Sequence, residues 1–173
     1  IGMIPEDRYK HGLCRDMTLA SNCAAGYLGD KALGANGIMN KKAMQERCRE
    51  YVKKYDIRIA DEYGNVSQLS GGNAQKALFS RWMNADPKVL IVDEPTAGVD
   101  VGAKAEIQRL MLEMCSDGVS IIFISSELEE VIRCSNRIVI MRDGKKAGEL
   151  NGEGCTQADI MKVIAGEKVG ETA

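Results

Sequence analysis

The sequence lacks the glycine-rich loop G-x-x-x-x-G-K-[ST], with which many nucleotide-binding enzymes cradle phosphate groups. Gly98, Gly102 and Lys104 imitate this loop, but the spacing between the two glycines is one residue short. The chain therefore lacks the backbone cradle on which such enzymes hold phosphate groups.

Patterns for metal binding are also missing. The six cysteines form no C-x-x-C pair and His11 is the only histidine, which argues against a zinc site. We expect reduced, mostly buried thiols, as in a cytosolic protein, and a structural or solvated role for His11.

No apolar run approaches the roughly 18 residues that a membrane-spanning helix needs. The net charge is −2 with both signs spread along the chain, which argues against a nucleic-acid partner and a polybasic membrane surface. The chain has no starting methionine and no signal peptide, and Ile1-Gly2-Met3-Ile4-Pro5 has the pattern of a strand end inside a longer protein. We expect one globular domain with two lobes, forming part of a larger protein.

The apolar pattern divides the chain near residue 86. Before that point helical periodicity dominates, and residues 40–55 place an apolar stripe opposite a charged face. After it, apolar strands alternate with helices, which predicts an α/β fold with a parallel sheet covered by helices. The expected parts are a core strand in 1–7, a helical lobe in 8–85, a core portion in 86–166 and a tail in 167–173. The expected elements after residue 70 are helices at 73–84, 101–116, 127–133 and 156–165, parallel strands at 89–93, 119–125 and 138–141, and a hairpin strand at 146–150.

Ser70-Gly71-Gly72 precedes the helix expected at 73–84. Glycines let a backbone approach a ligand closely, and the start of a helix presents unpaired N–H groups beside the serine hydroxyl. This combination suits a phosphate group. Alone, however, the three residues are more typical of an ordinary helix N-cap.

Asp93-Glu94 ends the strand expected at 89–93. The carboxyl edge of a parallel sheet is where ligands bind in such folds. One carboxylate there can hold Mg²⁺ through water, and the next can polarise an attacking water. Asp100 follows and is expected to cap the helix at 101–116.

These segments together resemble the signature and Walker B motifs of an ATP-binding cassette (ABC) ATPase. The run Leu69-Ser70-Gly71-Gly72-Asn73-Ala74-Gln75-Lys76 is similar to the N-Q-Q-K variant of the signature, with Ala74 as one departure. From Gly2 to about Gly166 the chain resembles the portion, from the Q-loop onward, of the second cassette of tandem-cassette importers for ribose and galactose. The strings that carry this narrower resemblance are Ile4–Arg8, Lys10–Leu13, Gly98–Lys104 and Ser125–Leu128.

The resemblance implies a partial ABC ATPase core, like that of P-loop NTPases, with a parallel sheet and an α-helical subdomain. Asp93 and Glu94 would be catalytic, with Asp93 holding Mg²⁺ through water. Asp100 would be the D-loop aspartate between two cassettes. The residues that would bind ATP held by the other cassette are Ser70, Gly71, Gly72, Asn73 and Gln75.

Three departures from the family pattern limit the chain's own ATP site. Glu6 stands at the position of the Q-loop glutamine, and Ser126 stands at the position of the switch histidine. A serine cannot titrate near neutral pH as an imidazole does. Because the phosphate loop is also missing, we expect the chain by itself to bind nucleotides very weakly and to show no measurable ATP hydrolysis. Its main contribution would be the signature helix that it offers to a partner.

The resemblance also implies partners. The helical lobe would dock membrane permease subunits near residues 6–25, at the inner, cytoplasmic face of the cell membrane. ATP and Mg²⁺ would be the cofactors of the intact transporter, but this fragment would not bind them. Its sheet would be left uncovered, which would favour self-association of the fragment. The alternatives are a nucleoside importer, a catalytically silent regulatory module, and a cassette ATPase that works on DNA.

Overall fold

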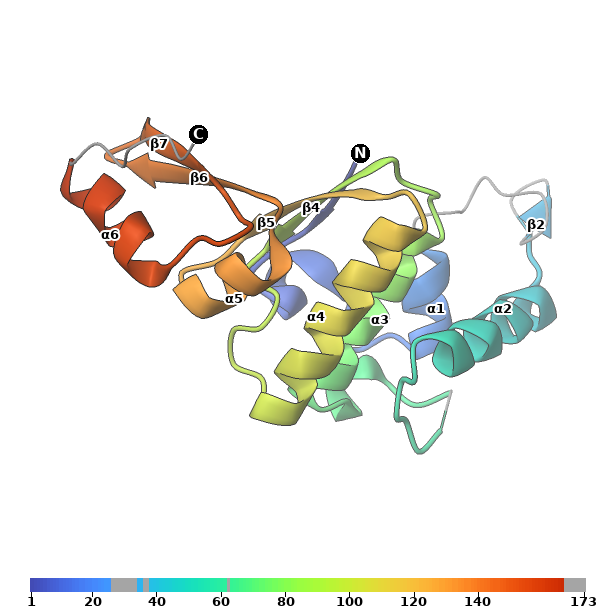
Figure 1. The fold of residues 1–173 in the computed structure, drawn as a ribbon. Coiled ribbons are helices and arrows are strands. Elements are labelled where there is room, and N and C mark those ends of the chain that lie inside the picture. The colour runs from blue at the N-terminus through green and yellow to red at the C-terminus, as the bar shows by residue number, and fades with distance from the viewer. Residues whose placement is uncertain (26–33, 36–37, 62, 167–173) are drawn as a thin grey trace. The chain divides into compact units, whose positions relative to one another are not determined.

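The computed structural model describes residues 1–25, 34–35, 38–61 and 63–166, so the tail expected at 167–173 lies outside the described residues. The chain forms two compact units, residues 1–122 and 123–173. No described helix is both long and apolar enough to cross a bilayer. The elements, labelled in Figure 1, are β1 (Gly2–Ile4), η1 (Arg8–Gly12), α1 (Leu19–Ala24), β2 (Gly34–Ala35), β3 (Ile38–Met39), α2 (Lys41–Lys54), η2 (Val66–Gln68), α3 (Gly71–Met83), β4 (Val89–Asp93), α4 (Val101–Ser116), β5 (Ser120–Ile124), α5 (Leu128–Cys134), β6 (Arg137–Arg142), β7 (Lys145–Asn151) and α6 (Gln157–Ala165).

Strands β1, β4 and β5 form a three-stranded sheet in the order β1-β4-β5, and β1 runs parallel to β4. Alternate residues point to opposite faces of a strand. Ile4, Leu90 and Val92 are fully buried on one face. On the other face Met3, which pairs with Ile91, is 48% exposed. One face of the sheet therefore carries the core, and the other leaves apolar side chains uncovered.

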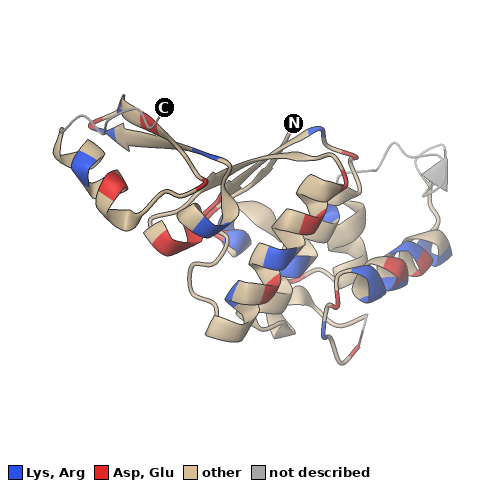
Figure 2. Ribbon diagram, in the orientation of Figure 1, with Lys and Arg blue, Asp and Glu red and all other residues tan. Residues whose placement is uncertain are grey.

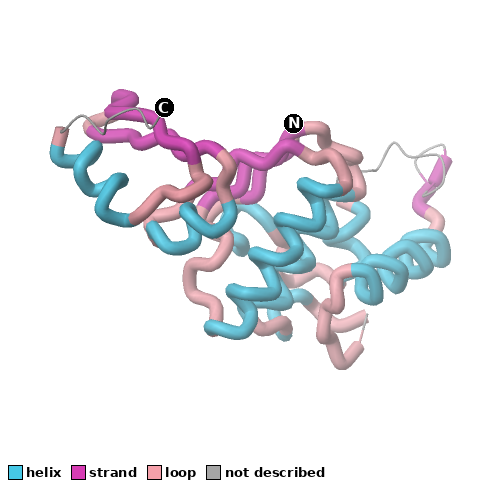
Figure 3. Tube along the Cα trace, in the orientation of Figure 1, coloured by secondary structure: helices cyan, strands magenta, loops and turns pink. Residues whose placement is uncertain are grey.

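Helices α3 and α4 lie side by side beneath β1 and β4 (Figures 1 and 3). The middle of α3, from Gly72 to Ser80, is buried almost throughout. The helix predicted at 101–116 is α4, and the apolar residues spaced along one of its faces are all buried: Ile107, Leu110, Met111 and Met114. Gly118 follows α4 with φ of 92°, a left-handed conformation that glycine commonly adopts just after the end of a helix.

Helix α2 confirms the predicted two-sided pattern. Cys48 and Tyr55 are buried on one side, whereas charged residues of both signs follow one another along the other (Figure 2). Asn40 caps the helix by accepting a hydrogen bond from the backbone N–H of Ala43. The short β2-β3 pair that precedes α2 was not predicted, because it has only two residues in each strand.

The second unit is built around the antiparallel pair β6-β7, against which α6 packs. Its core consists of Ile138, Ile140, Ile160 and Val163. A capping box begins α6, because Thr156 and Asp159 each accept a hydrogen bond from the other's backbone.

The hairpin predicted between residues 138–141 and the strand at 146–150 is confirmed, because β6 pairs antiparallel with β7. The expectation that residues 138–141 also extend the parallel sheet was wrong, because among the described residues β6 pairs with β7 alone. The reason is local, since Asp143 and Gly144 both adopt positive φ, 50° and 72°, and so fold the chain straight back.

The cysteine prediction was only partly right. Cys23 and Cys48 are buried, but Cys14 and Cys115 are exposed, and no disulfide joins any of the six cysteines. Cys14 lies in the loop after η1, and Cys115 lies near the solvent-facing end of α4. A small apolar residue at a loop or helix end does not need burial, so residue type alone could not place these thiols.

Candidate functional site

The N-terminus of α3 presents the Ser70 hydroxyl to solvent. Ser70 is the N-cap, and its Oγ accepts hydrogen bonds from the Asn73 backbone N–H at 3.4 Å and from Asn73 Nδ2 at 2.9 Å. Helix geometry leaves the amides of Gly71 and Gly72 without intrahelical acceptors. Because Oγ already accepts hydrogen bonds from two N–H groups, the hydroxyl is left to donate its own proton. A phosphate oxygen would be a suitable acceptor for that proton.

Gly71 and Gly72 are required by packing as well as by any ligand. A Cβ at Gly72 would lie 2.6 Å from the Cβ of Ala103 on α4, closer than carbon atoms can approach. A Cβ at Gly71 would lie 3.2 Å from the carbonyl oxygen of Gly98. The signature glycines therefore allow α3 to meet α4 and the turn that precedes it.

Asn73 and Gln75, the other predicted ATP contacts, differ in their surroundings. The Oδ1 atom of Asn73 accepts a hydrogen bond of 2.7 Å from the backbone N–H of Arg58. Gln75 is only 1% exposed, and its Nε2 has no hydrogen-bond partner among the described residues. Of the predicted set, Ser70, Gly71 and Asn73 are the residues that reach the surface.

Asp93 ends β4, and Glu94 begins the turn that follows, with both side chains half-buried. Glu94 has φ of 43°, a left-handed conformation that costs a side-chain-bearing residue about 1–2 kcal/mol. A strained residue is a recognised indication of a functional site, because the surrounding fold must hold it in place. The turn is closed by hydrogen bonds from Ala97 N–H to the Glu94 carbonyl at 3.1 Å and from Val99 N–H to the Thr96 carbonyl at 3.4 Å.

The carboxylates at this strand end are suitable donors for Mg²⁺, which prefers oxygen ligands and usually keeps several waters. Among the described residues, no three or more His, Cys, Asp or Glu side chains gather closely enough to hold a metal ion by themselves. Asp93 could therefore contribute to a magnesium site only alongside water and phosphate oxygens. Asp100 is the N-cap of α4, as predicted, and its Oδ1 accepts from Ala103 N–H at 2.9 Å.

The segment after β1 joins this site through a residue that sequence reasoning missed. Glu6 is exposed. The Asp7 carboxylate accepts from the backbone N–H groups of Lys10 and Tyr9, at 2.9 and 3.1 Å, and these bonds hold its pKa below the usual value. The Arg8 guanidinium donates to the Gly71 carbonyl at 3.2 Å and to the Ala97 carbonyl. No local pattern could have shown this, because the acceptors lie 63 and 89 residues away.

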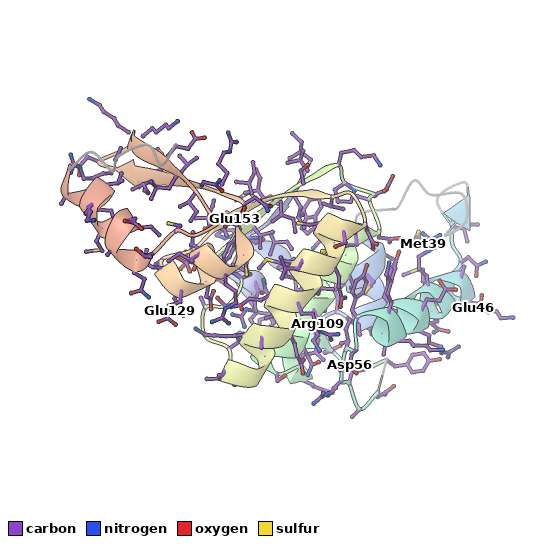
Figure 4. The ribbon with its side chains drawn as sticks, viewed as in Figure 1. Met39, Glu46, Asp56, Arg109, Glu129 and Glu153 are labelled. Atoms are coloured by element: carbon purple, nitrogen blue, oxygen red, sulfur yellow. The ribbon has the colours of Figure 1, made fainter. Side chains whose placement is uncertain are left out.

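A buried lysine lies on α3, just after the Ser70–Gly72 turn. The Lys76 side chain is 6% exposed, and its Nζ lies 2.7 Å from a Glu106 carboxylate oxygen and donates to the Asp56 carbonyl at 2.9 Å. The Arg58 guanidinium lies 3.6 Å from a carboxylate oxygen of Glu106 and 3.4 Å from one of Asp56. Asp56 is labelled in Figure 4. This cluster ties the loop after α2 to α3 and α4, close to Asn73.

Ser126 is exposed in the second unit, between Ser125 and the start of α5. The Glu127 backbone N–H donates to the Ser125 hydroxyl at 3.1 Å. In the first unit, in contrast, direct contacts connect the predicted signature residues with the turn between β4 and α4.

Comparison with known proteins decides the family. The model of the ABC transporter family matches residues 1–97, more than half of the chain, and this range includes both the α3 N-terminus and the acids that end β4. The chain belongs to the ABC transporter family. The ABC cassette fold predicted from the sequence is thereby confirmed, an α/β fold with a parallel sheet and helices.

Curated members of the ABC transporter family align with almost the whole chain. The ribose import ATP-binding protein RbsA 2 of Escherichia coli O157:H7 is 43% identical over 166 residues, which are 96% of this chain and 32% of that protein. The ribose import ATP-binding protein RbsA of Corynebacterium glutamicum is 41% identical over 167 residues, with the same coverage of 96% and 32%. The chain thus spans about a third of the length of the curated relatives that it matches.

Solved ABC cassettes share the fold. MJ1267, an ATP-binding cassette of an ABC transporter, superposes with a TM-score of 0.72 at 21% identity, over 94% of this chain and 68% of that one. The dimeric bacterial ABC transporter cassette MJ0796 gives a TM-score of 0.70 at 22% identity, over 90% and 64%.

Proposed function

We propose that the chain is the signature-bearing part of an ATP-binding cassette in an importer of ribose, galactose or a related sugar. The observation that carries this proposal is the exposed Ser70 hydroxyl, which caps α3 and is left to donate its proton. The printed names of the relatives, ribose import proteins at 41–43% identity, support the sugar class. Cargo itself is selected by the permease and by a binding protein.

Ser70 and the amides of Gly71 and Gly72 act on ATP that is held by a second cassette. The hydroxyl and the N–H groups at the helix N-terminus donate to phosphate oxygens, where the positive end of the helix favours negative charge. Asn73 and Gln75 are proposed contacts of the same ATP, and Asn73 also donates a hydrogen bond to the Ser70 hydroxyl. Asp100 lies at the interface between the two cassettes.

Asp93 and Glu94 belong to the ATP site on the chain's own sheet. Glu94 orients and polarises the attacking water, and Asp93 accepts hydrogen bonds from waters around Mg²⁺. When bound, Mg²⁺ supplies positive charge that offsets the charge developing on the phosphoryl group. This site hydrolyses slowly, because Ser126 and Glu6 stand where a histidine and a glutamine serve other cassettes.

The chain corresponds, in this proposal, to the second of two tandem cassettes, from the Q-loop onward. The strings Ile4–Arg8, Lys10–Leu13, Gly98–Lys104 and Ser125–Leu128 support this assignment by their resemblance to the second cassette. Residues 8–85 form the helical lobe, residues 86–166 form the core portion, and a permease docks near residues 6–25. The working place of the protein is then the inner, cytoplasmic face of the cell membrane.

The uncovered face of the sheet supports the view that more of a cassette packs there. Met3 and Ile122 are 48% and 52% exposed on strands β1 and β5. In the 173-residue chain alone, this face is expected to be covered by a second copy. Light scattering at high concentration tests this, and a monomer would contradict it.

The sugar assignment is tested by transport into vesicles that contain the full-length protein, its permease and a sugar-binding protein. Ribose or galactose is expected to stimulate ATP hydrolysis, whereas a nucleoside is not. Stimulation by a nucleoside instead would favour the nucleoside importer, and complete absence of hydrolysis would favour a silent regulatory module. For the 173-residue chain alone, titration calorimetry should find a Kd for ATP weaker than about 100 μM, which is about 5.5 kcal/mol of binding.

A further inference from the structure

The Arg8 side chain bridges the signature turn (Ser70–Gly72) and the turn after the strand-end acids (Glu94–Val99). Its guanidinium donates to the carbonyl oxygen of Gly71 at 3.2 Å and to the carbonyl oxygen of Ala97. Arg8 itself follows Glu6 by two residues, in the segment that leaves β1. Three segments that are far apart in the sequence thus meet at a single half-buried group.

The backbone around Arg8 is shaped to bring the two turns together. A Cβ at Gly71 would lie 2.9 Å from Arg8 Nη1 and 3.2 Å from the Gly98 carbonyl. Gly98 has φ of 66°, which turns the chain sharply beside the guanidinium. Only a residue without a side chain leaves room for the arginine and the second turn at this position.

The chemistry of the contact requires arginine. A guanidinium is planar and carries five N–H donors in a fixed fork, so it can hold two carbonyl oxygens at once, whereas a lysine ammonium is a point charge on a flexible stem. Among the described residues Arg8 forms no ion pair with a carboxylate, so its charge is directed at peptide carbonyls. A cation beside the positive N-terminal end of α3 is electrostatically unfavourable. The two carbonyl contacts must therefore be what keeps it there.

We propose that Arg8 is a positioning residue that holds the signature turn and the 94–99 turn as one unit. The spacing between Ser70, which acts on the partner's ATP, and Glu94, which acts on the chain's own ATP, is then fixed through Arg8. This inference rests on the proposed function for its consequence in catalysis. The structural link itself rests only on the contacts of Arg8.

The test compares Arg8→Lys with Arg109→Lys in the full-length protein. Arg109, labelled on α4 in Figure 4, is an exposed arginine that pairs only with Glu113 among the described residues, at 3.3 Å. In Arg8→Lys, amide hydrogen exchange is expected to become about tenfold faster both in peptide 70–74 and in peptide 95–100. The reason is that each turn loses a hydrogen bond from a charged group. Exchange in the buried stretch 77–80 should not change. Arg109→Lys should leave all three regions as they are.

The second readout is steady-state ATP hydrolysis by the assembled transporter. Arg8→Lys is expected to lower kcat about tenfold with KM changed less than about twofold, because geometry and not ground-state affinity is lost. Faster exchange in only one of the two peptides, or throughout the protein, would overturn the proposal, and so would an unchanged kcat. Ser70→Arg is measured in parallel. If Ser70→Arg also leaves hydrolysis unchanged, the proposed function fails, while hydrogen exchange still decides whether Arg8 links the turns.

Discussion

The side-chain amide of Asn73 donates a hydrogen bond of 2.9 Å to the hydroxyl oxygen of Ser70. The other end of the same amide accepts from Arg58 N–H at 2.7 Å, so both polar atoms of Asn73 are engaged within the chain. Asn73 was predicted as a direct ATP contact. That role stays a prediction, and the contacts add an indirect one, because they orient the hydroxyl that would meet the phosphate.

Asn73→Asp reverses this orientation. A carboxylate in place of the amide would accept the Ser70 proton instead of donating to its oxygen, so the hydroxyl would no longer be left to donate to phosphate. We expect ATP hydrolysis by the full-length transporter to fall at least about tenfold, as for loss of one donor to a developing anion. The melting temperature should not fall, because an acidic residue in the first turn of a helix is favourable. Asn65→Asp is the control, because Asn65 makes no side-chain capping bond, and equal losses would contradict this account.

Local sequence signals predicted much of the fold. The strand at 89–93 and the helix at 101–116 occur with the predicted bounds. Their buried stripes and strand-end acids are visible in the sequence alone. Contacts across long separations were not predictable: Arg8 with Gly71 and Ala97, and Gly72 with Ala103, depend on how α3 crosses α4. The hairpin at Asp143-Gly144 was predictable because its signal is local, but the expectation that residues 138–141 also join the parallel sheet was wrong.

Gly72→Ala tests the packing role of the signature. The new methyl group would meet the Ala103 Cβ at 2.6 Å, so α3 and α4 must move apart. We expect a loss of about 1–3 kcal/mol in the free energy of unfolding, measured by urea denaturation of the chain. Adding Ala103→Gly to the same protein should restore part of that loss. Gly102→Ala, whose Cβ would meet only the Asp100 carboxylate at 3.3 Å, should not destabilise, and an equal loss there would refute the packing explanation.

Glu94→Asn tests whether strain is held at the strand end. Asparagine tolerates the left-handed conformation better than glutamate does, so relief of the strain should raise the free energy of unfolding by about 0.5–1 kcal/mol. Hydrolysis at this cassette's own site should be lost at the same time. Glu94→Gln keeps the strain and should leave the melting temperature unchanged. If the two variants have the same melting temperature, φ of 43° at Glu94 stores no strain.

The buried side chain of Tyr55 should make the free energy of unfolding fall at alkaline pH. Burial of its phenol, with smaller effects from Tyr51 and Asp117, raises the pKa of Tyr55 to about 12. The unfolded chain ionises this group near pH 10, so between about pH 10 and 12 the folded state binds more protons and stability falls as the pH rises. Urea denaturation at pH 9 and pH 11 should show the fall in the native chain and a smaller one in Tyr55→Phe. The same fall in both proteins would place its origin elsewhere.

In the proposed function, the signature turn of this chain contributes to hydrolysis of the ATP bound by another cassette. That contribution is larger than the one that Asp93 and Glu94 make to hydrolysis at this cassette's own site. The most direct measurement is ATP hydrolysis by the full-length transporter carrying Ser70→Arg, Glu94→Gln or the control Ser67→Arg, an exposed serine just before the turn. Ser70→Arg should abolish most of the activity, Glu94→Gln should remove a minor part, and Ser67→Arg should change little. Equal losses from Ser70→Arg and Glu94→Gln would contradict the account.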